Sequence, residues 1–125
     1  MLNRFANNAL KIKEDLKKII CNISKSKKNI IYSYGATAKG NTLINFLDLD
    51  EGTISYCIDS TKIKQNKFLP GSNIPIVDEE FAKYNPPNYF LLTAWNYKDE
   101  IIKKVRESGN LDTIFILPFP SPHFA

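Results

Sequence analysis

Histidine and cysteine are scarce in this sequence. The chain has one histidine, His123, and two cysteines, Cys21 and Cys57, which are too few and too far apart to predict a disulfide framework or a zinc site. His123 stands near the end of the sequence among prolines, so no Ser–His–Asp or Cys–His set can be assembled. The sequence therefore predicts no metal site and no catalytic residues within this chain.

Long apolar runs are also missing. No segment approaches the roughly 20 apolar residues that span a bilayer, and the amino terminus lacks the pattern of a signal peptide. Hydrophobic residues make up 43% of the chain and charged residues 24%, as in an ordinary globular protein. We expect one soluble, cytoplasmic domain over residues 1–125, with no membrane partner.

The formal net charge is +4, and much of the excess lies in the lysines of residues 11–28. This pattern favours a solvated helix face, while a surface for nucleic acid or for an acidic partner is the alternative. Because aromatic residues do not interleave with these lysines, no platform for stacked bases is evident. We therefore expect no nucleic-acid partner.

Strand patterns alternate with helix patterns along the chain. Apolar spacing predicts an amphipathic helix over residues 2–24. Further helices are predicted over 38–47, over 78–83 and from Asn96, as the cap, to about 108, and strands over 29–33, 53–58, 74–77, 89–94 and 113–117. Three prolines, Pro118, Pro120 and Pro122, are predicted to end regular structure.

This alternation predicts an α/β fold with a mostly parallel sheet, because parallel strands need crossover connections. The strands are apolar on both faces, which is typical of a sheet that is covered on both sides. We expect a Rossmann-like three-layer sandwich with helices on both faces and an extra helix at the amino terminus.

The first strand–helix turn is the clearest candidate for a binding site, since ligands of open α/β sheets bind beyond the carboxyl ends of strands. Gly35 allows a tight turn, and the helix that follows directs unpaired N–H groups toward the same place. Thr37, Lys39 and Asn41 add polar donors, so a phosphate or diphosphate is the expected ligand. The spacing matches neither the dinucleotide glycine pattern nor a P-loop, where lysine follows glycine, and a purely structural turn remains the alternative.

Three further strand ends carry candidate ligand contacts. Asp59 ends the second strand, where an acid can bind ribose hydroxyls or serve only as a solvated strand end or cap. Trp95 can stack on a ring or fill the sheet edge, and Asn96 can cap a helix or contact the ligand. Gln65 lies in a basic loop over residues 60–73, whose lysines are either simply solvated or form a lid over an anion.

Four segments of this sequence recur in the same order in a known family. They are Tyr34–Leu43, Ile58–Asp59 with Lys64–Gln65, Leu69–Ile76 and Leu91–Asn96. Together they resemble the C-terminal domain of the S-adenosylmethionine-dependent sugar C-methyltransferases, which act on nucleotide-linked deoxysugars. The resemblance covers roughly residues 5–120.

The resemblance implies a Rossmann-like domain that packs against a methyl-donor domain and helps to hold a nucleotide-sugar. In such enzymes a zinc domain and the S-adenosylmethionine domain come first, so no cofactor is expected on this chain, which looks like an isolated, non-catalytic C-terminal domain. Ser72–Asn73 stands where the family commonly has Thr-His. The expected ligand-binding residues are Gly35, Ala36, Thr37, Lys39, Gly40, Asn41, Asp59, Gln65, Trp95 and Asn96.

Two other functions fit the same residues. The first is a stand-alone NAD(P)- or nucleotide-binding module, which Asp59 favours and the absence of the dinucleotide glycine pattern disfavours. The second is an interaction domain in which the Leu2–Ile23 helix docks to a separate methyltransferase core.

Overall fold

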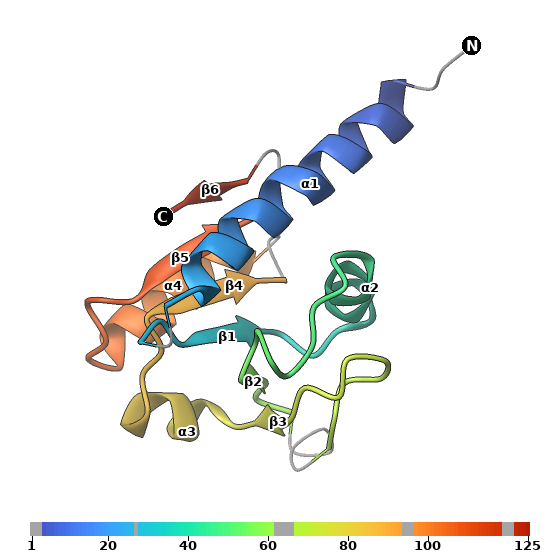
Figure 1. Cartoon of the computed structure of the whole chain (residues 1–125). Helices are drawn as coiled ribbons and strands as arrows, with labels where there is room; N and C mark the ends of the chain where they lie inside the picture. Colours follow the sequence, from blue (N-terminus) through green and yellow to red (C-terminus); the bar gives the residue numbers. More distant parts are fainter. Residues whose placement is uncertain (1–3, 27, 62–66, 94–96, 119–121) are drawn as a thin grey trace.

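A computed structural model of the chain describes residues 4–26, 28–61, 67–93, 97–118 and 122–125. Helices and strands alternate through most of it (Figure 1). In chain order the elements are α1 (Arg4–Ser24), β1 (Ile31–Tyr34), α2 (Ala38–Phe46), β2 (Tyr56–Ile58), β3 (Ile76–Val77), α3 (Glu79–Tyr84), β4 (Tyr89–Leu92), α4 (Lys98–Glu107), β5 (Ile114–Leu117) and β6 (His123–Phe124).

The strands of the described residues form one six-stranded sheet in the order β3-β2-β1-β4-β5-β6. Strands β1 to β5 run parallel, and β6 runs antiparallel to β5, which confirms the prediction of a mostly parallel sheet. From β1 the chain continues to β2 on one side, and it returns later to place β4 on the other side. The direction of winding therefore changes between β1 and β4, where open α/β sheets form a crevice.

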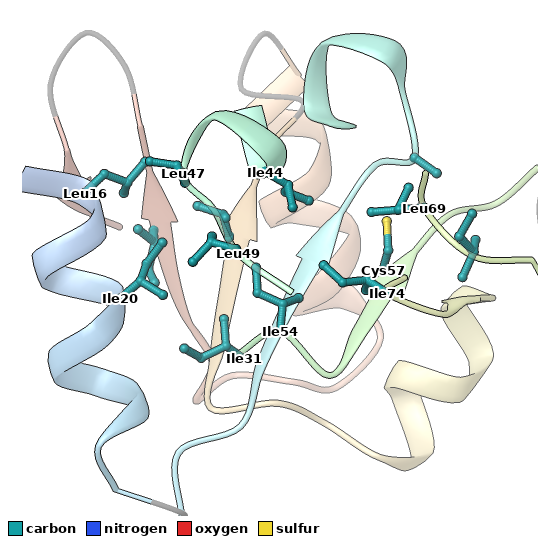
Figure 2. Packing of buried hydrophobic residues seen from close by; sticks show 14 residues of the cluster. Leu16, Ile20, Ile31, Ile44, Leu47, Leu49, Ile54, Cys57, Leu69 and Ile74 are labelled. Carbon is teal, nitrogen blue, oxygen red and sulfur yellow. The ribbon is translucent and has the colours of Figure 1, made fainter. Parts of the chain in front are cut away.

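Alternate residues of the strands are buried in two different hydrophobic clusters, because successive side chains point to opposite faces of a sheet. On one face Ile31, Cys57 and Leu91 pack with residues of α1 and α2, including Leu16 and Ile44 (Figure 2). The second cluster contains strand residues Tyr32, Ile58, Phe90 and Phe115 with Ala82 of α3 and Ile101 and Val105 of α4. Helices thus pack against both faces of the sheet.

The start of α4 differs from the prediction that Asn96 caps it. The cap position is held by Tyr97, whose side chain makes no capping hydrogen bond, and the helix begins at Lys98. Asn96 itself lies outside the described residues. Asp99 and Glu100 lie in the first turn, where their negative charges favour the positive end of the helix dipole. The described residues therefore supply no side-chain cap for this helix, and the predicted cap by Asn96 stays a prediction.

The prediction that the three carboxy-terminal prolines end regular structure is wrong. Beyond Pro122 the chain forms β6, in which Leu117 is paired with His123 and Ile116 with Phe124. Phe115 and Ala125 exchange two backbone hydrogen bonds, of 3.1 and 2.9 Å between nitrogen and oxygen. A pairing only two residues long leaves no alternation in the sequence from which it could be predicted.

Candidate functional site

The turn after β1 is held against the end of β2. Gly35 has a φ of 102°, a left-handed conformation that glycine adopts without strain. Its N–H donates to the carbonyl oxygen of Ile58 at 2.8 Å, and the next N–H, of Ala36, donates to Oδ2 of Asp59 at 2.7 Å. The first two amides of the predicted anion cradle are therefore hydrogen-bonded within the protein.

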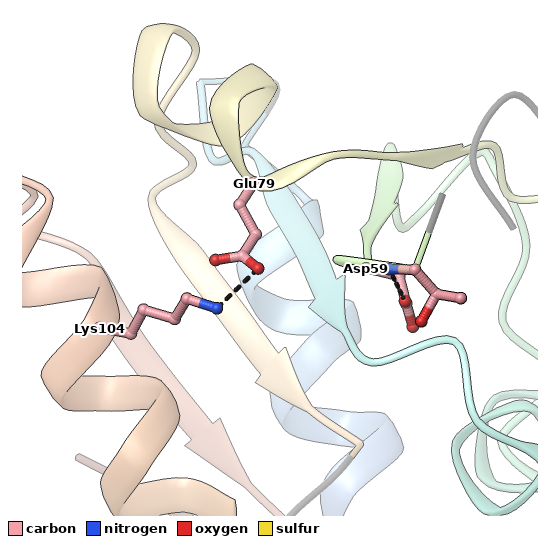
Figure 3. Close-up of polar contacts among 4 residues, drawn as sticks. Asp59, Glu79 and Lys104 are labelled. Carbon is pink, nitrogen blue, oxygen red and sulfur yellow. Dashed lines mark hydrogen bonds and ion pairs between the residues drawn. The ribbon is translucent and has the colours of Figure 1, made fainter. Parts of the chain in front are cut away.

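Asp59 is buried, with only 7% of its surface exposed, and its carboxylate accepts two backbone hydrogen bonds, one of which is drawn in Figure 3. Besides the bond from Ala36, Oδ1 accepts from the N–H of Thr61 at 2.7 Å. Because these donors lie after β1 and after β2, the carboxylate links the carboxyl ends of the two strands. In this structure Asp59 has the role of a positioning residue, and its predicted contact with a ligand stays a prediction.

The start of α2 lies unusually close to the end of β4. A Cβ atom added at Gly40 would lie 2.6 Å from Oγ1 of Thr93, so only glycine fits without a shift of one of these segments. The Thr93 hydroxyl in turn lies 2.8 Å from the carbonyl oxygen of Tyr34 and 3.0 Å from that of Gly35. Gly40 therefore serves a helix–strand contact at the point where the winding changes direction.

Three backbone N–H groups remain available at the amino terminus of α2. Thr37 is the cap residue, and its Oγ1 accepts from the N–H of Gly40 at 3.1 Å. Among the described residues, no hydrogen bond involves the N–H groups of Thr37, Ala38 and Lys39, and all three residues are exposed. With the Lys39 ammonium group they form a small electropositive surface, because the helix dipole has its positive end here.

Of the other predicted ligand contacts, Asn41 is described by the structure and three are not. Asn41 lies in α2 with its Oδ1 buried and without a hydrogen-bond partner among the described residues. One turn further on, Asn45 donates from Nδ2 to the carbonyl oxygen of Pro70 at 3.1 Å and fixes the 67–75 segment beside the helix. Three predicted residues, Gln65, Trp95 and Asn96, lie outside the described residues.

A pocket of about 300 Å³ between α3, α4 and the sheet was missed by the sequence interpretation. Its wall includes Tyr34 of β1, and Glu79 of α3 pairs with Lys104 of α4 at 2.8 Å across it (Figure 3). The pKa of the Tyr34 hydroxyl is raised, first by burial, then by the charge of Glu79 and its hydrogen bond to the hydroxyl, and last by the charge of Asp59. The hydroxyl is therefore a neutral donor at physiological pH.

The sequence contains one signal for this pocket, in the segment after α3. Pro86 and Pro87 follow the helix and prevent its extension, so α3 has only 6 residues. A helix of that length covers only part of a sheet face. A short helix indicates a pocket only once the width of the sheet is known.

The topology and the electropositive helix terminus define an α/β domain with a candidate anion site where the winding of its sheet changes direction. Residues 1–120 match a family model described as the C-methyltransferase C-terminal domain, and the chain belongs to this family. It is similar to the C-methyltransferase NovU of Streptomyces niveus, with 36% identity over 118 residues. That alignment covers 94% of this chain and 28% of NovU. The family resemblance inferred from the sequence is confirmed.

No helix among the described residues is both long and apolar enough to cross a membrane. In the same part of the chain, no group of three or more histidine, cysteine, aspartate or glutamate residues is placed to hold a metal ion.

Proposed function

We propose that this chain is a Rossmann-like, three-layer C-terminal domain that holds a nucleotide-linked sugar for a methyltransferase and does not transfer methyl groups alone. Membership of the C-methyltransferase C-terminal family supports the enzyme class. The observation that carries the binding role is the group of three N–H groups at the start of α2, those of Thr37, Ala38 and Lys39. The strand order and the helices on both faces support the fold.

In this proposal the diphosphate of the ligand lies at the amino terminus of α2. The three N–H groups donate to its oxygens, and Lys39 adds a positive charge. Asp59 acts indirectly, because its bond to Ala36 keeps the turn in the conformation that presents these amides. Gln65, Trp95 and Asn96 are proposed to contact the base and sugar and to close the site.

The methyl donor, S-adenosylmethionine, is assigned to a separate domain of the complete enzyme, in the same chain or in a partner. The chain spans only 28% of the length of NovU, so most of such an enzyme lies beyond this family domain. The domain is proposed to work in the cytoplasm, where nucleotide-sugars are made.

Titration of the ¹⁵N-labelled chain with UDP-glucose and with a dTDP-sugar tests the binding role. We expect saturable shifts of the amides of Thr37, Ala38 and Lys39, and a Lys39→Met variant that binds about 2–5-fold more weakly, since an exposed charge contributes modestly. Lys25→Met, which removes an exposed lysine after α1, is the matched control. No shift at millimolar ligand would reject binding by this chain.

A second candidate is docking to a separate methyltransferase core through α1. The amino-terminal half of α1 extends past the sheet (Figure 1), and Leu10 on it is 53% exposed. Gel filtration of the chain with a separately produced core distinguishes this function. Co-elution that is lost in Leu10→Glu supports docking, whereas independent elution at micromolar concentrations contradicts it.

A further inference from the structure

The pocket between α3 and α4 has the form of a second ligand site. We propose that it binds a neutral, planar, single-ring heterocycle with a lactam edge, meaning an N–H next to a C=O, as in uracil. The pocket lies against the cluster of α3 and α4, on the opposite face of the sheet from α2. The inference therefore goes beyond the proposed function and does not depend on it.

The floor of the pocket is apolar and partly aromatic. Ile58 and Phe90 come from the sheet, and Ala82 and Val105 come from the helices on either side. The Tyr34 and Phe90 rings meet edge to face, with 5.6 Å between their centres. Such a floor favours a flat apolar face, because ring faces and edges of opposite partial charge attract each other. About 300 Å³ is the lower end of the range for ligand pockets and suits one ring.

The rim offers one acceptor next to one donor. Nζ of Lys104 lies 2.8 Å from Oε1 of Glu79, and this pair spans the space between α3 and α4 (Figure 3). An ammonium group has three N–H donors and a carboxylate accepts about four hydrogen bonds. After the bond between Lys104 and Glu79, each of the two groups can still make further hydrogen bonds. A lactam N–H can donate to Glu79 while its C=O accepts from Lys104.

The charges at the rim favour a neutral ligand over an ion. Glu79 and Lys104 already neutralise each other, and the further rim charges, Lys83 and Glu107, are also of opposite sign. The rim therefore has no net charge with which to attract an anion or a cation. A free amino acid, whose two charged ends would compete with the existing ion pair, is the rival that the test must separate.

Titration of the ¹⁵N-labelled 125-residue chain with free uracil derivatives provides the test. The probes are 1-methyluracil, which keeps the N3–H lactam edge, 1,3-dimethyluracil, which keeps the ring and loses the donor, and leucine. For a ligand of this size we expect a Kd of about 1–10 mM for 1-methyluracil. The affected amides should be those of Lys104, Glu107 and Ser108, and 1,3-dimethyluracil should bind about tenfold more weakly.

Variants on the same two helices localise the effect. Lys104→Met and Glu79→Gln should each weaken 1-methyluracil about 3–10-fold, while their neighbours outside the pocket, Lys103→Met and Glu80→Gln, leave the Kd unchanged. Ala82→Leu, which fills the pocket, should abolish binding. Circular dichroism checks whether each variant is folded. If Ala82→Leu is unfolded, the charge variants and the series of probes still test the proposal.

Three results would overturn the proposal. They are an absence of saturable shifts up to about 20 mM 1-methyluracil, well above the expected Kd, equal binding of 1,3-dimethyluracil, and binding of leucine in preference to 1-methyluracil. None of the probes carries a phosphate. Failure here therefore leaves the nucleotide-sugar titration, which is read at Thr37–Lys39, unaffected.

Discussion

Replacing Asp59 with alanine tests whether its carboxylate holds the site together. The variant removes two hydrogen bonds, each of 2.7 Å, to the N–H groups of Ala36 and Thr61. Thr61 is exposed, so water can replace its acceptor, and its loss costs about 1 kcal/mol. Ala36 is 8% exposed, so loss of its charged acceptor inside the protein costs a further 1–3 kcal/mol, on the order of a buried polar group. The expected loss in the free energy of unfolding is about 2–4 kcal/mol.

Urea denaturation followed by circular dichroism measures this loss. At the slope usual for a small protein, the midpoint should fall by about 1–2 M urea. Asp50→Ala is the matched control, because its Oδ1 also accepts a backbone hydrogen bond, from Gly52 at 2.9 Å, but at an exposed position. It should cost about 0.5–1 kcal/mol. Equal losses for the two variants would refute the view that Asp59 is the buried link between β1 and β2.

Other predictions concern tight backbone contacts and a buried hydroxyl. Gly40→Ala should lower the free energy of unfolding by about 1–3 kcal/mol, because the new Cβ clashes with Thr93. The double variant Gly40→Ala/Thr93→Ala should recover part of this loss, and a double-mutant cycle followed by urea denaturation measures the recovery. Gly109→Ala, at a φ of 102° with open space around it, should cost only about 1 kcal/mol in the same assay, and a larger loss would contradict strain as the sole cause. Because the pKa of the Tyr34 hydroxyl is raised in the folded state, the stability that the neutral hydroxyl contributes is complete below pH 10 and is lost as the pH rises further. Tyr34→Phe should therefore flatten the fall of stability above pH 10, as urea denaturation at several pH values measures.

The regular elements were predictable from local patterns. The apolar spacing along α1, the start of α2 and the stop of α4 before Gly109 depend on residues close in sequence, and each was located within a few residues. The second strand was predicted over residues 53–58 but covers only Tyr56–Ile58. Its β-branched start predicts a strand, whereas Ile54 directly follows a turn over residues 51–53 and its N–H donates to the carbonyl oxygen of Asp50.

The candidate site was only partly predictable, because its hydrogen bonds join distant segments. Gly40 is a predicted ligand contact, and in the structure it makes room for Thr93, 53 positions later in the sequence. Asp59 was expected to face a ligand, and its partner Ala36 could be found only from the pairing of β1 with β2. The local sequence around a glycine or aspartate at a strand end is thus the same whether the residue contacts a ligand or another segment of the protein.

The two edges of the sheet determine how this protein meets other chains. At one edge β3 is two residues long and follows Pro75, which has no N–H to offer, and Ile76 donates to the carbonyl oxygen of Lys67 at 2.7 Å. At the other edge β6 is equally short and covers β5. Among the described residues, neither edge presents a long row of free backbone groups, so a neighbouring copy has few backbone donors and acceptors to pair with when adding a strand. Crowding in the cell should therefore not drive this domain into sheet-to-sheet aggregates, and association should proceed through helices and side chains.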